Sequence, residues 1–172
     1  HRPDVLTHPQ EIARTIEDAH KAGKIRAFGV SNFTQAQITA LAQFSAVPIV
    51  STQPELSPLR IDTIENGELD QAIAMDLAVM AWSPLGGGRI GEPQNVREQN
   101  VAAALSGVAA AHNVSRTAAA YSWIMAHPAR PIPIVGSQNP ARIIEAADAF
   151  KIQWTRADWY SVLVAARGVP LP

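Results

Sequence analysis

Four apolar runs along the chain end in polar residues whose side chains can form hydrogen bonds. The endings are Ser31-Asn32, Thr52-Gln53, Trp82-Ser83 and Gly136-Ser137-Gln138-Asn139. Asparagine and glutamine each supply a donor and an acceptor, and a serine or threonine hydroxyl can act as either. Strands that deliver such groups at their carboxyl ends, with helices between them, are how α/β enzymes build a site. We therefore expect one site assembled from four strand ends.

The strands expected to carry these residues are short and are separated by helices. They are expected over residues 25–30, 48–51, 77–81 and 132–135. No hairpin signal joins any two of them, so they should run parallel. Two architectures have such strands, an open doubly wound sheet and a (β/α)8 barrel. The barrel is favoured because polar residues end every strand and are not confined to one switch point.

Capping residues mark where helices should begin. Thr7 with Gln10, and Thr34 with Gln37, have the spacing of a capping box, in which each side chain accepts a hydrogen bond from the other residue's backbone N–H. A loop is expected from Pro54 to Asp62 and a long polar connection from Gly86 to Asn95. The further helices are expected over 68–75, 101–111, 115–126, from Pro140 toward Phe150, and from Thr155 to near Gly168.

Composition and charge exclude several classes of function. The 172 residues are 47% hydrophobic and 17% charged, as in a globular domain with its own core. The net charge is -1, so we expect neither nucleic acid nor a membrane surface as a partner. No apolar run approaches the ~20 residues of a membrane span. Cysteine is absent, which fits a reducing compartment, and we expect a cytoplasmic protein.

The run from Gly86 to Gly91 (GGGRIG) matches the G-x-G-x-x-G pattern of dinucleotide-binding loops. That pattern needs a helix to begin inside the motif, so that the helix N-terminus meets the pyrophosphate. Glu92-Pro93-Gln94 disfavours an immediate helix, and we interpret the run as a flexible glycine loop lying over a ligand. The histidines beyond position 1 lack metal-site spacing, so no metal is expected.

Five motifs, taken in order, carry a resemblance to a known family. They are His1 to Asp4 (HRPD), Gly23 to Phe33 (GKIRAFGVSNF), Gln53 to Pro58 (QPELSP), Ala81 to Gly88 (AWSPLGGG) and Ile132 to Ser137 (IPIVGS). They occur in order along the chain, and together they resemble bacterial oxidoreductases of the aldo-keto reductase family, a match that covers nearly the whole chain. The resemblance implies a (β/α)8 TIM barrel that binds NADPH at the carboxyl ends of its strands. Residues 1–172 would then be a partial barrel domain, the C-terminal portion from the end of strand four to strand eight plus the C-terminal helix, with the N-terminal strands missing.

The resemblance also implies a role for individual residues. His1 resembles the active-site histidine that orients and polarises the substrate carbonyl. Ser31, Asn32 and Gln53 resemble the residues that hydrogen-bond the nicotinamide carboxamide, with a helix cap as the alternative role for Asn32. Trp82 resembles the aromatic residue that stacks on the nicotinamide ring, with a barrel-rim aromatic as the alternative.

Further cofactor contacts follow the last two expected strands. The implied pyrophosphate contacts are Ser83, Leu85 and Gly87, and the implied adenosine-end contacts are Ser137, Asn139 and Arg142. Arg142 would pair with the 2′-phosphate and so favour NADPH, or it would be a solvated helical arginine. Glu145 would contact the adenine amino group or pair with Arg142. Some relatives carry lysine where this chain has Gly136, which softens the expected NADP preference.

The function that the resemblance implies is NADP(H)-dependent reduction of a small aldehyde or ketone to an alcohol by hydride transfer. The family's proton-donor tyrosine, with its lysine and aspartate, lies upstream, and neither Tyr121 nor Tyr160 fits that role. We therefore expect the parent protein to be the enzyme, and this chain alone to be inactive and to aggregate or self-associate through its open edges. The alternative is a non-catalytic nucleotide-binding module, similar to the regulatory-subunit barrels of the family.

Overall fold

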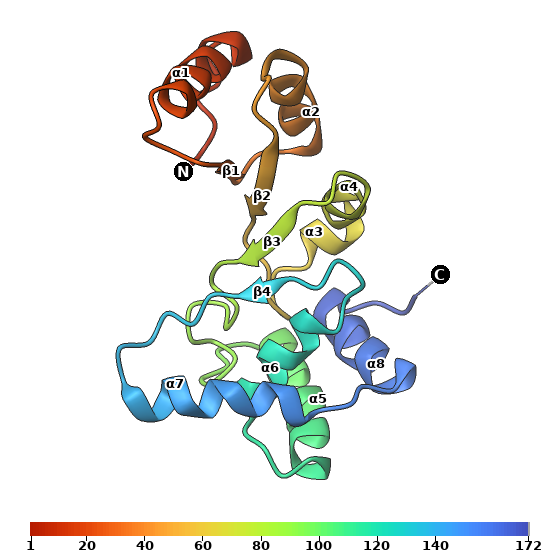
Figure 1. The fold of residues 1–172 in the computed structure, drawn as a ribbon. Helices are drawn as coiled ribbons and strands as arrows, with labels where there is room; N and C mark the ends of the chain where they lie inside the picture. The colour runs from red at the N-terminus through yellow and green to blue at the C-terminus, as the bar shows by residue number, and fades with distance from the viewer. Residues whose placement is uncertain (172) are drawn as a thin grey trace.

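The computed structural model describes residues 1–171, in which helices alternate with the strands of a parallel sheet (Figure 1). The strands are β1 (Phe28–Ser31), β2 (Ile49–Gln53), β3 (Ala78–Ala81) and β4 (Ile132–Pro133). They lie in the order β1-β2-β3-β4, and all neighbours are parallel, which confirms that prediction. Because the strand order runs in one direction, the described sheet has no switch point of the kind found in doubly wound folds.

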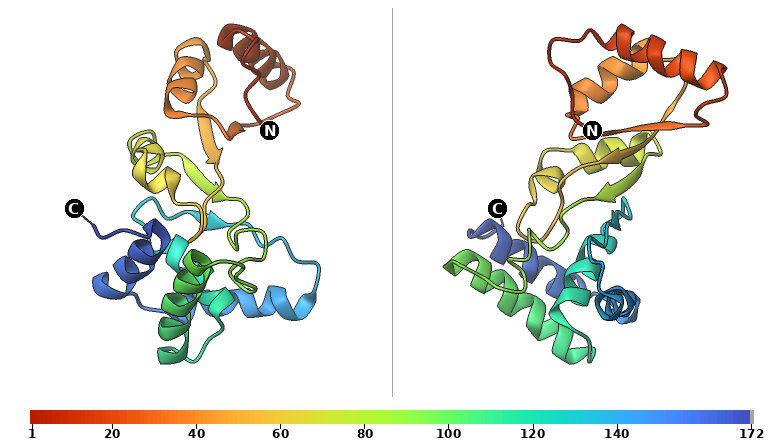
Figure 2. Two further views of the ribbon diagram at one scale, coloured as in Figure 1. Left: turned by 180° about the vertical axis from the view of Figure 1, so that it is seen from behind. Right: turned by 90° about the vertical axis from the view of Figure 1, so that its left-hand side faces the viewer.

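Helices occupy both ends of the molecule (Figure 2). Helices α1 and α2 lie at one end beside β1, and α5, α6 and α8 pack together at the other end. In chain order the helical elements are α1 (Pro9–Lys21), α2 (Gln35–Phe44), α3 (Asp62–Glu65), α4 (Glu68–Ala74), α5 (Val96–Ala111), α6 (Arg116–Met125), α7 (Pro140–Ala146), the 3-10 helix η1 (Ala147–Lys151) and α8 (Arg156–Arg167).

The two faces of the sheet differ in what they carry. Val30, Thr52 and Val79 lie side by side in register, and all three are buried. The residues before them in β1 and β3, Gly29 and Ala78, point to the opposite face and are exposed. One face therefore contributes to the core, and the other is lined by small, accessible residues.

The pairing of β1 with β2 contains an irregularity. Phe28 pairs with Ile49, but Gly29 pairs with Ser51, so Val50 is an extra residue in β2. An unpaired residue of this kind is a bulge, which bends the strand and breaks its in-and-out alternation. Between the buried residues Ile49 and Thr52, β2 accordingly has two successive residues that are not buried, Val50 (41% exposed) and Ser51.

A pair of tryptophans joins α6 to α8. The rings of Trp123 and Trp159 stack with centroids 4.9 Å apart and planes inclined by 12°. Each indole Nε1 donates to the other residue's backbone oxygen at 3.0 Å. Trp123 is fully buried, so its indole N–H has this carbonyl as its partner in place of water. The two helices are thus fixed in register by reciprocal bonds and by stacking.

The capping prediction is right for α2 and wrong for α1. Gln37 N donates to Thr34 Oγ1 at 3.3 Å, and Thr34 N donates to Gln37 Oε1 at 2.9 Å, which completes the expected box. At α1 the N-cap is His8, whose Nδ1 accepts a backbone N–H at 3.2 Å. Thr7 is not the cap because its hydroxyl donates to Asp4 Oδ2 at 2.9 Å, in a turn that precedes the helix.

Several boundaries also differ from those expected. Helix α5 begins at Val96, earlier than predicted, because Asn95 Oδ1 accepts a hydrogen bond from Glu98 N at 3.0 Å and caps the helix there. Strand β4 ends at Pro133 and does not reach residue 135, because its partner β3 ends at Ala81, whose oxygen accepts the last hydrogen bond of the pair, from Ile134 N at 2.9 Å. Helix α3 was not expected, and the predicted run after Pro140 divides into α7 and η1.

Candidate functional site at the carboxyl ends of the strands

The carboxyl ends of β1 and β2 are locked together by their backbones and by one side chain. Ser31 and Gln53 are register partners, and both Ser31 Oγ and Asn32 N donate to the Gln53 carbonyl oxygen, at 2.8 and 3.2 Å. The Gln53 side chain is half-buried and makes no hydrogen bond within residues 1–171. Its amide donor and acceptor therefore remain free to meet a ligand.

Asn32 lies at the junction of three polar groups. Its φ of 59° is left-handed, a conformation that asparagine adopts more readily than most residues, and it turns the chain out of β1. Trp82 Nε1 donates to Asn32 Oδ1 at 2.8 Å, and Asn32 Nδ2 donates to the His1 carbonyl at 3.1 Å and to Ser31 Oγ at 3.2 Å. The cap of α2 is Thr34, so the side chain of Asn32 is used for these contacts and not for capping.

The backbone of Trp82 is held from both sides by the segment after β2. Trp82 N donates to Pro54 O at 3.1 Å, and Leu56 N donates to Trp82 O at 3.3 Å. The residue is half-buried, and its ring is in no aromatic stack among the described residues. A planar group brought to this edge of the sheet can therefore pack against the indole.

The glycine loop after β3 is a chain of tight turns. Ser83 has a φ of 53°, its Oγ accepts from Gly87 N at 3.1 Å, and Gly88 N donates to Leu85 O at 3.2 Å. Ile90, 1% exposed, pins the loop to the core. No helix begins in the motif, since α5 starts at Val96, which confirms that it is not a dinucleotide-binding loop of the Rossmann type.

Glu98 anchors this loop, and the sequence pattern did not single it out. Its carboxylate is 3% exposed, accepts from Gln94 N at 2.7 Å and pairs with Arg89 Nη1 at 3.1 Å. The Gln94 N–H, helped by the nearby Arg89 charge, holds the pKa of Glu98 below its ordinary value despite burial. The sequence gives no specific signal for it, because Glu98 lies among polar residues at the start of α5, where a charged side chain is usually solvated.

Ser137, Asn139 and Arg142 follow β4, in the connection to α7 and in α7 itself. Ser137 Oγ accepts from Asn139 N at 3.1 Å, and Asn139 Oδ1 caps α7 by accepting from Ala141 N at 2.9 Å. Arg142 is exposed and forms no ion pair within residues 1–171, Glu145 included. No hydrogen bond joins these three residues to the group around Asn32 in the described part of the chain.

In the described part of the chain, His1 contacts the site only through its backbone oxygen, which accepts from Asn32 Nδ2, and the other histidines lie elsewhere. The His1 side chain is exposed and forms no hydrogen bond among the described residues. Within residues 1–171 no group of three histidine, aspartate or glutamate side chains could hold a metal ion. In the same residues no helix has the length and apolar character to cross a membrane.

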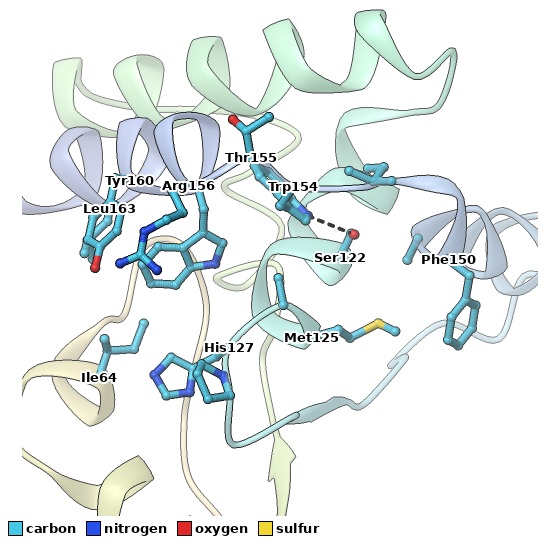
Figure 3. Close-up of a pocket in the computed structure, with 15 residues that line it drawn as sticks. Ile64, Ser122, Met125, His127, Phe150, Trp154, Thr155, Arg156, Tyr160 and Leu163 are labelled. Atoms are coloured by element: carbon cyan, nitrogen blue, oxygen red, sulfur yellow. Dashed lines mark hydrogen bonds between the residues drawn. The ribbon is translucent and has the colours of Figure 1, made fainter.

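A separate hollow of about 660 Å³ lies between α6, η1 and α8 (Figure 3). It contains none of the residues that the sequence proposed for the site, and its walls are mainly aromatic and aliphatic. His127 borders it with Nδ1 accepting from Ala129 N at 3.2 Å, and burial lowers the pKa of this imidazole. The residues drawn there include Trp154, whose Nε1 donates to Ser122 Oγ at 3.0 Å.

Comparison with known proteins gives consistent matches over the whole chain. It is 62% identical over 172 residues to a 6-dehydroglucose reductase of Novosphingobium aromaticivorans and 36% identical over 176 aligned positions to the oxidoreductase YdhF of Escherichia coli. Each of these two alignments covers 100% of this chain and 57% of the relative. The chain therefore spans little more than half the length of these relatives.

Solved structures and a family profile agree with these matches. A glycerol dehydrogenase from Gluconobacter oxydans superimposes with a TM-score of 0.86 at 26% identity, over 100% of this chain and 58% of that one. A thermostable aldo-keto reductase solved with the inhibitor epalrestat gives 0.85 at 20% identity, over 96% of this chain and 57% of that one, which supports the barrel-like fold. The profile described as "Aldo/keto reductase family" matches residues 1–163. The chain belongs to the aldo/keto reductase family.

Proposed function

We propose that the protein containing this chain is an NADP(H)-dependent reductase that converts the carbonyl of an oxidised sugar to an alcohol. The observation that carries the proposal is the meeting of His1, Ser31, Asn32 and Trp82 through hydrogen bonds at the ends of adjacent parallel strands, with a free Gln53 amide beside them. The relative at 62% identity is named a 6-dehydroglucose reductase, and we propose 6-dehydroglucose or a similar aldehyde sugar as the substrate.

The residues at this edge fit a nicotinamide. Its carboxamide presents one donor group and one acceptor, and the free side chain of Gln53 offers the complementary pair. Stacking against the accessible face of Trp82 would fix which face of the ring is exposed and is worth ~0.5–1.5 kcal/mol beyond burial. When bound, the cofactor supplies the hydride. The chain's own residues orient the ring and keep its position relative to the strand ends.

The rest of the dinucleotide would follow the edge of the sheet toward α7. We propose that Ser83, Leu85 and Gly87 lie beside the pyrophosphate, where the Gly87 N–H would have to exchange its bond to Ser83 for one to a phosphate oxygen. Ser137 and Asn139 would border the adenosine. Arg142 would reach the 2′-phosphate, since it is exposed and forms no ion pair within residues 1–171.

His1 would act on the substrate. A neutral imidazole can donate one hydrogen bond to the carbonyl oxygen as negative charge develops there. The proton must come from a different residue. Tyr121 lies 5% exposed in α6, and Tyr160 lies in α8 against Arg156, so neither is at the strand ends.

We propose that a segment preceding His1 supplies the proton donor and the remaining strands, which would pair with the edges β1 and β4. Without it, both edges and the inner face of the sheet are open, so the 172-residue chain alone should be inactive and should self-associate or aggregate. The complete protein is proposed to be cytoplasmic and to act on a small-molecule substrate without nucleic acid or membrane partners.

The test is NADPH consumption by the complete protein, first with 6-dehydroglucose and then with a panel of aldehydes and ketones. Turnover that is lost in Gln53→Leu through weaker NADPH binding supports the proposal. NADPH binding without turnover on any carbonyl would indicate a nucleotide-binding module. Neither binding nor turnover would refute the proposed cofactor site.

The adenosine end has its own test. A charge-assisted hydrogen bond contributes about 1.5–3 kcal/mol, so Arg142→Ala should reduce the preference for NADPH over NADH by roughly 10- to 150-fold. Arg14, exposed on α1 and without an ion pair in residues 1–171, provides the control, because Arg14→Ala changes the net charge equally. A preference unchanged by Arg142→Ala would refute the contact to the 2′-phosphate.

A further inference from the structure

The hollow between α6, η1 and α8 has the size and the walls of a small-molecule site. Its volume is about 660 Å³, and ligand pockets typically measure roughly 300–1,000 Å³. None of the residues drawn around it belongs to a strand (Figure 3). Met125, Ile152 and Leu163 contribute aliphatic walls. The hollow is therefore a separate place where an apolar group could leave water.

Two half-buried tryptophans supply the aromatic walls of the hollow. The indole N–H of Trp154 donates to Ser122 Oγ, and that of Trp159 donates to Trp123 O, both at 3.0 Å. One face of Trp159 is covered by the stacked ring of Trp123, so its other face remains for a ligand. Because both N–H groups are engaged, these indoles offer a ligand apolar ring surface and no hydrogen bond.

Polar groups gather around Trp159 at one end of the hollow. Figure 3 shows Arg156 and Tyr160 on one side of it and His127 on the other. The Arg156 Cζ lies 5.9 Å from the centroid of the Tyr160 ring, and the His127 ring lies 6.3 Å from that of Trp159. Arg156 is exposed and forms neither an ion pair nor a hydrogen bond within residues 1–171. This end of the hollow therefore carries an uncompensated positive charge.

The hydrogen bond of His127 fixes which of its nitrogens carries the hydrogen. Nδ1 accepts from Ala129 N at 3.2 Å, and an imidazole nitrogen that accepts carries no hydrogen. Burial lowers the pKa of His127 and outweighs the opposing effect of the Asp70 charge, so the ring is neutral at neutral pH with its hydrogen on Nε2. This N–H has no acceptor within the part of the chain that the structure describes. The hollow thus has a free donor opposite its free cation.

We propose that this hollow binds a small aromatic carboxylate. The aromatic ring would pack against the two indoles, and the carboxylate would lie between Arg156 and His127, where it accepts from a guanidinium and from an imidazole N–H. A planar apolar body suits the walls, and an anionic acceptor suits the polar end. The site does not depend on the proposed function, because it contains none of the residues at the carboxyl ends of the strands.

The test is a titration of the complete protein with 2-naphthoate, followed by calorimetry and by ¹H–¹⁵N spectra in which Trp82→Phe and Trp154→Phe assign two of the indole peaks. We expect a dissociation constant of about 1 mM or tighter, with the Trp154 peak shifted and the Trp82 peak unmoved. No binding, or a shift of the Trp82 peak alone, would overturn the proposal. Since NADPH is absent, failure of the proposed function would leave these outcomes unchanged.

Variants at exposed positions test the two halves of the site. Arg156→Gln should weaken 2-naphthoate binding by roughly 2- to 5-fold, the range of an exposed ion pair, and should not change binding of the neutral 2-naphthamide. Arg14→Gln on α1 is the matched control and should change neither. Equal affinity for the amide and the carboxylate would overturn the assignment of a carboxylate ligand.

The position of the ligand has its own variant. Ala126 is exposed at the edge of the hollow, so Ala126→Phe should fill the space and weaken binding by at least about 10-fold. Ala103→Phe makes the same change at an exposed position of α5, outside the hollow, and should leave the affinity as it was. An affinity unaffected by Ala126→Phe would overturn the placement of the ligand in this hollow.

Discussion

Replacing Gly29 by alanine should destabilise the sheet even though Gly29 is exposed. An added Cβ would lie 2.0 Å from Ser51 Oγ and 2.7 Å from the Ser51 backbone oxygen. Rotating the serine side chain relieves the first overlap, but only a shift of one strand relieves the second. Overpacking that forces such backbone shifts costs about 1–3 kcal/mol, and we expect the free energy of unfolding to fall by that amount.

The close approach follows from the bulge at Val50, which brings Gly29 level with Ser51. Gly107→Ala is the matched control, because it makes the same chemical change inside α5, where nothing lies within 4 Å of the new Cβ. In a helix interior, alanine is favoured over glycine by roughly 0.5–1 kcal/mol. The same substitution should therefore destabilise the protein at one position and stabilise it at the other.

The assay is urea denaturation of the complete protein, followed by circular dichroism. Adding Ser51→Ala to Gly29→Ala should restore only part of the lost stability, since the contact with the backbone oxygen remains. A Gly29→Ala variant within about 0.5 kcal/mol of the wild type would refute the steric reasoning. Complete restoration by Ser51→Ala would place the whole cost on the side chain and refute the part assigned to the backbone.

Three other outcomes are expected. Trp159→Phe should lower the free energy of unfolding by about 1–3 kcal/mol, because it leaves the buried Trp123 carbonyl without its donor; an unchanged urea midpoint would contradict this. The folded state lowers the pKa of Glu98 below its ordinary 4.5. The stabilisation that ionised Glu98 gives to the fold should therefore be complete above pH 4.5 and be lost as the pH falls through the folded-state pKa. Melting curves of Glu98→Gln at different pH values should lack this dependence. Finally, the 172-residue chain alone should show no cooperative monomeric unfolding by circular dichroism and ultracentrifugation, and a sharp monomeric transition would refute the need for a preceding segment.

The features that the sequence predicted best depend on short-range rules. Parallel strands followed from the alternation of strand and helix signals. The helix starts expected at Thr34, Ser115 and Thr155 depend on cap contacts with residues three positions away, so local sequence determines them. Thr7 failed although it has the same spacing, because Asp4 competes for its hydroxyl before the helix begins. A motif predicts a contact only where no nearby partner offers a better one.

The features that the sequence could not predict depend on residues distant along the chain. The bulge at Val50 arises from how β2 pairs with β1, and no residue in β2 marks it. Glu98 and Arg89 anchor the glycine loop, but a charged residue at the start of a helix is usually solvated. The resemblance named the residues of the candidate site, yet their roles stay predictions until binding is measured.

The hydrogen bonds of the site bear on how the residue types themselves should be interpreted. Asparagine and glutamine have the same functional group, and from the sequence Asn32 and Gln53 are equivalent candidates for binding an amide. The structure separates them, because the donors of Asn32 are satisfied within the protein and those of Gln53 are not. A residue whose polar atoms are already paired must break bonds in order to bind a ligand, whereas an unpaired one loses only water. Substitution of Asn32 should therefore disturb the hydrogen bonds that its side chain makes to His1, Ser31 and Trp82, whereas substitution of Gln53 removes no side-chain hydrogen bond within residues 1–171.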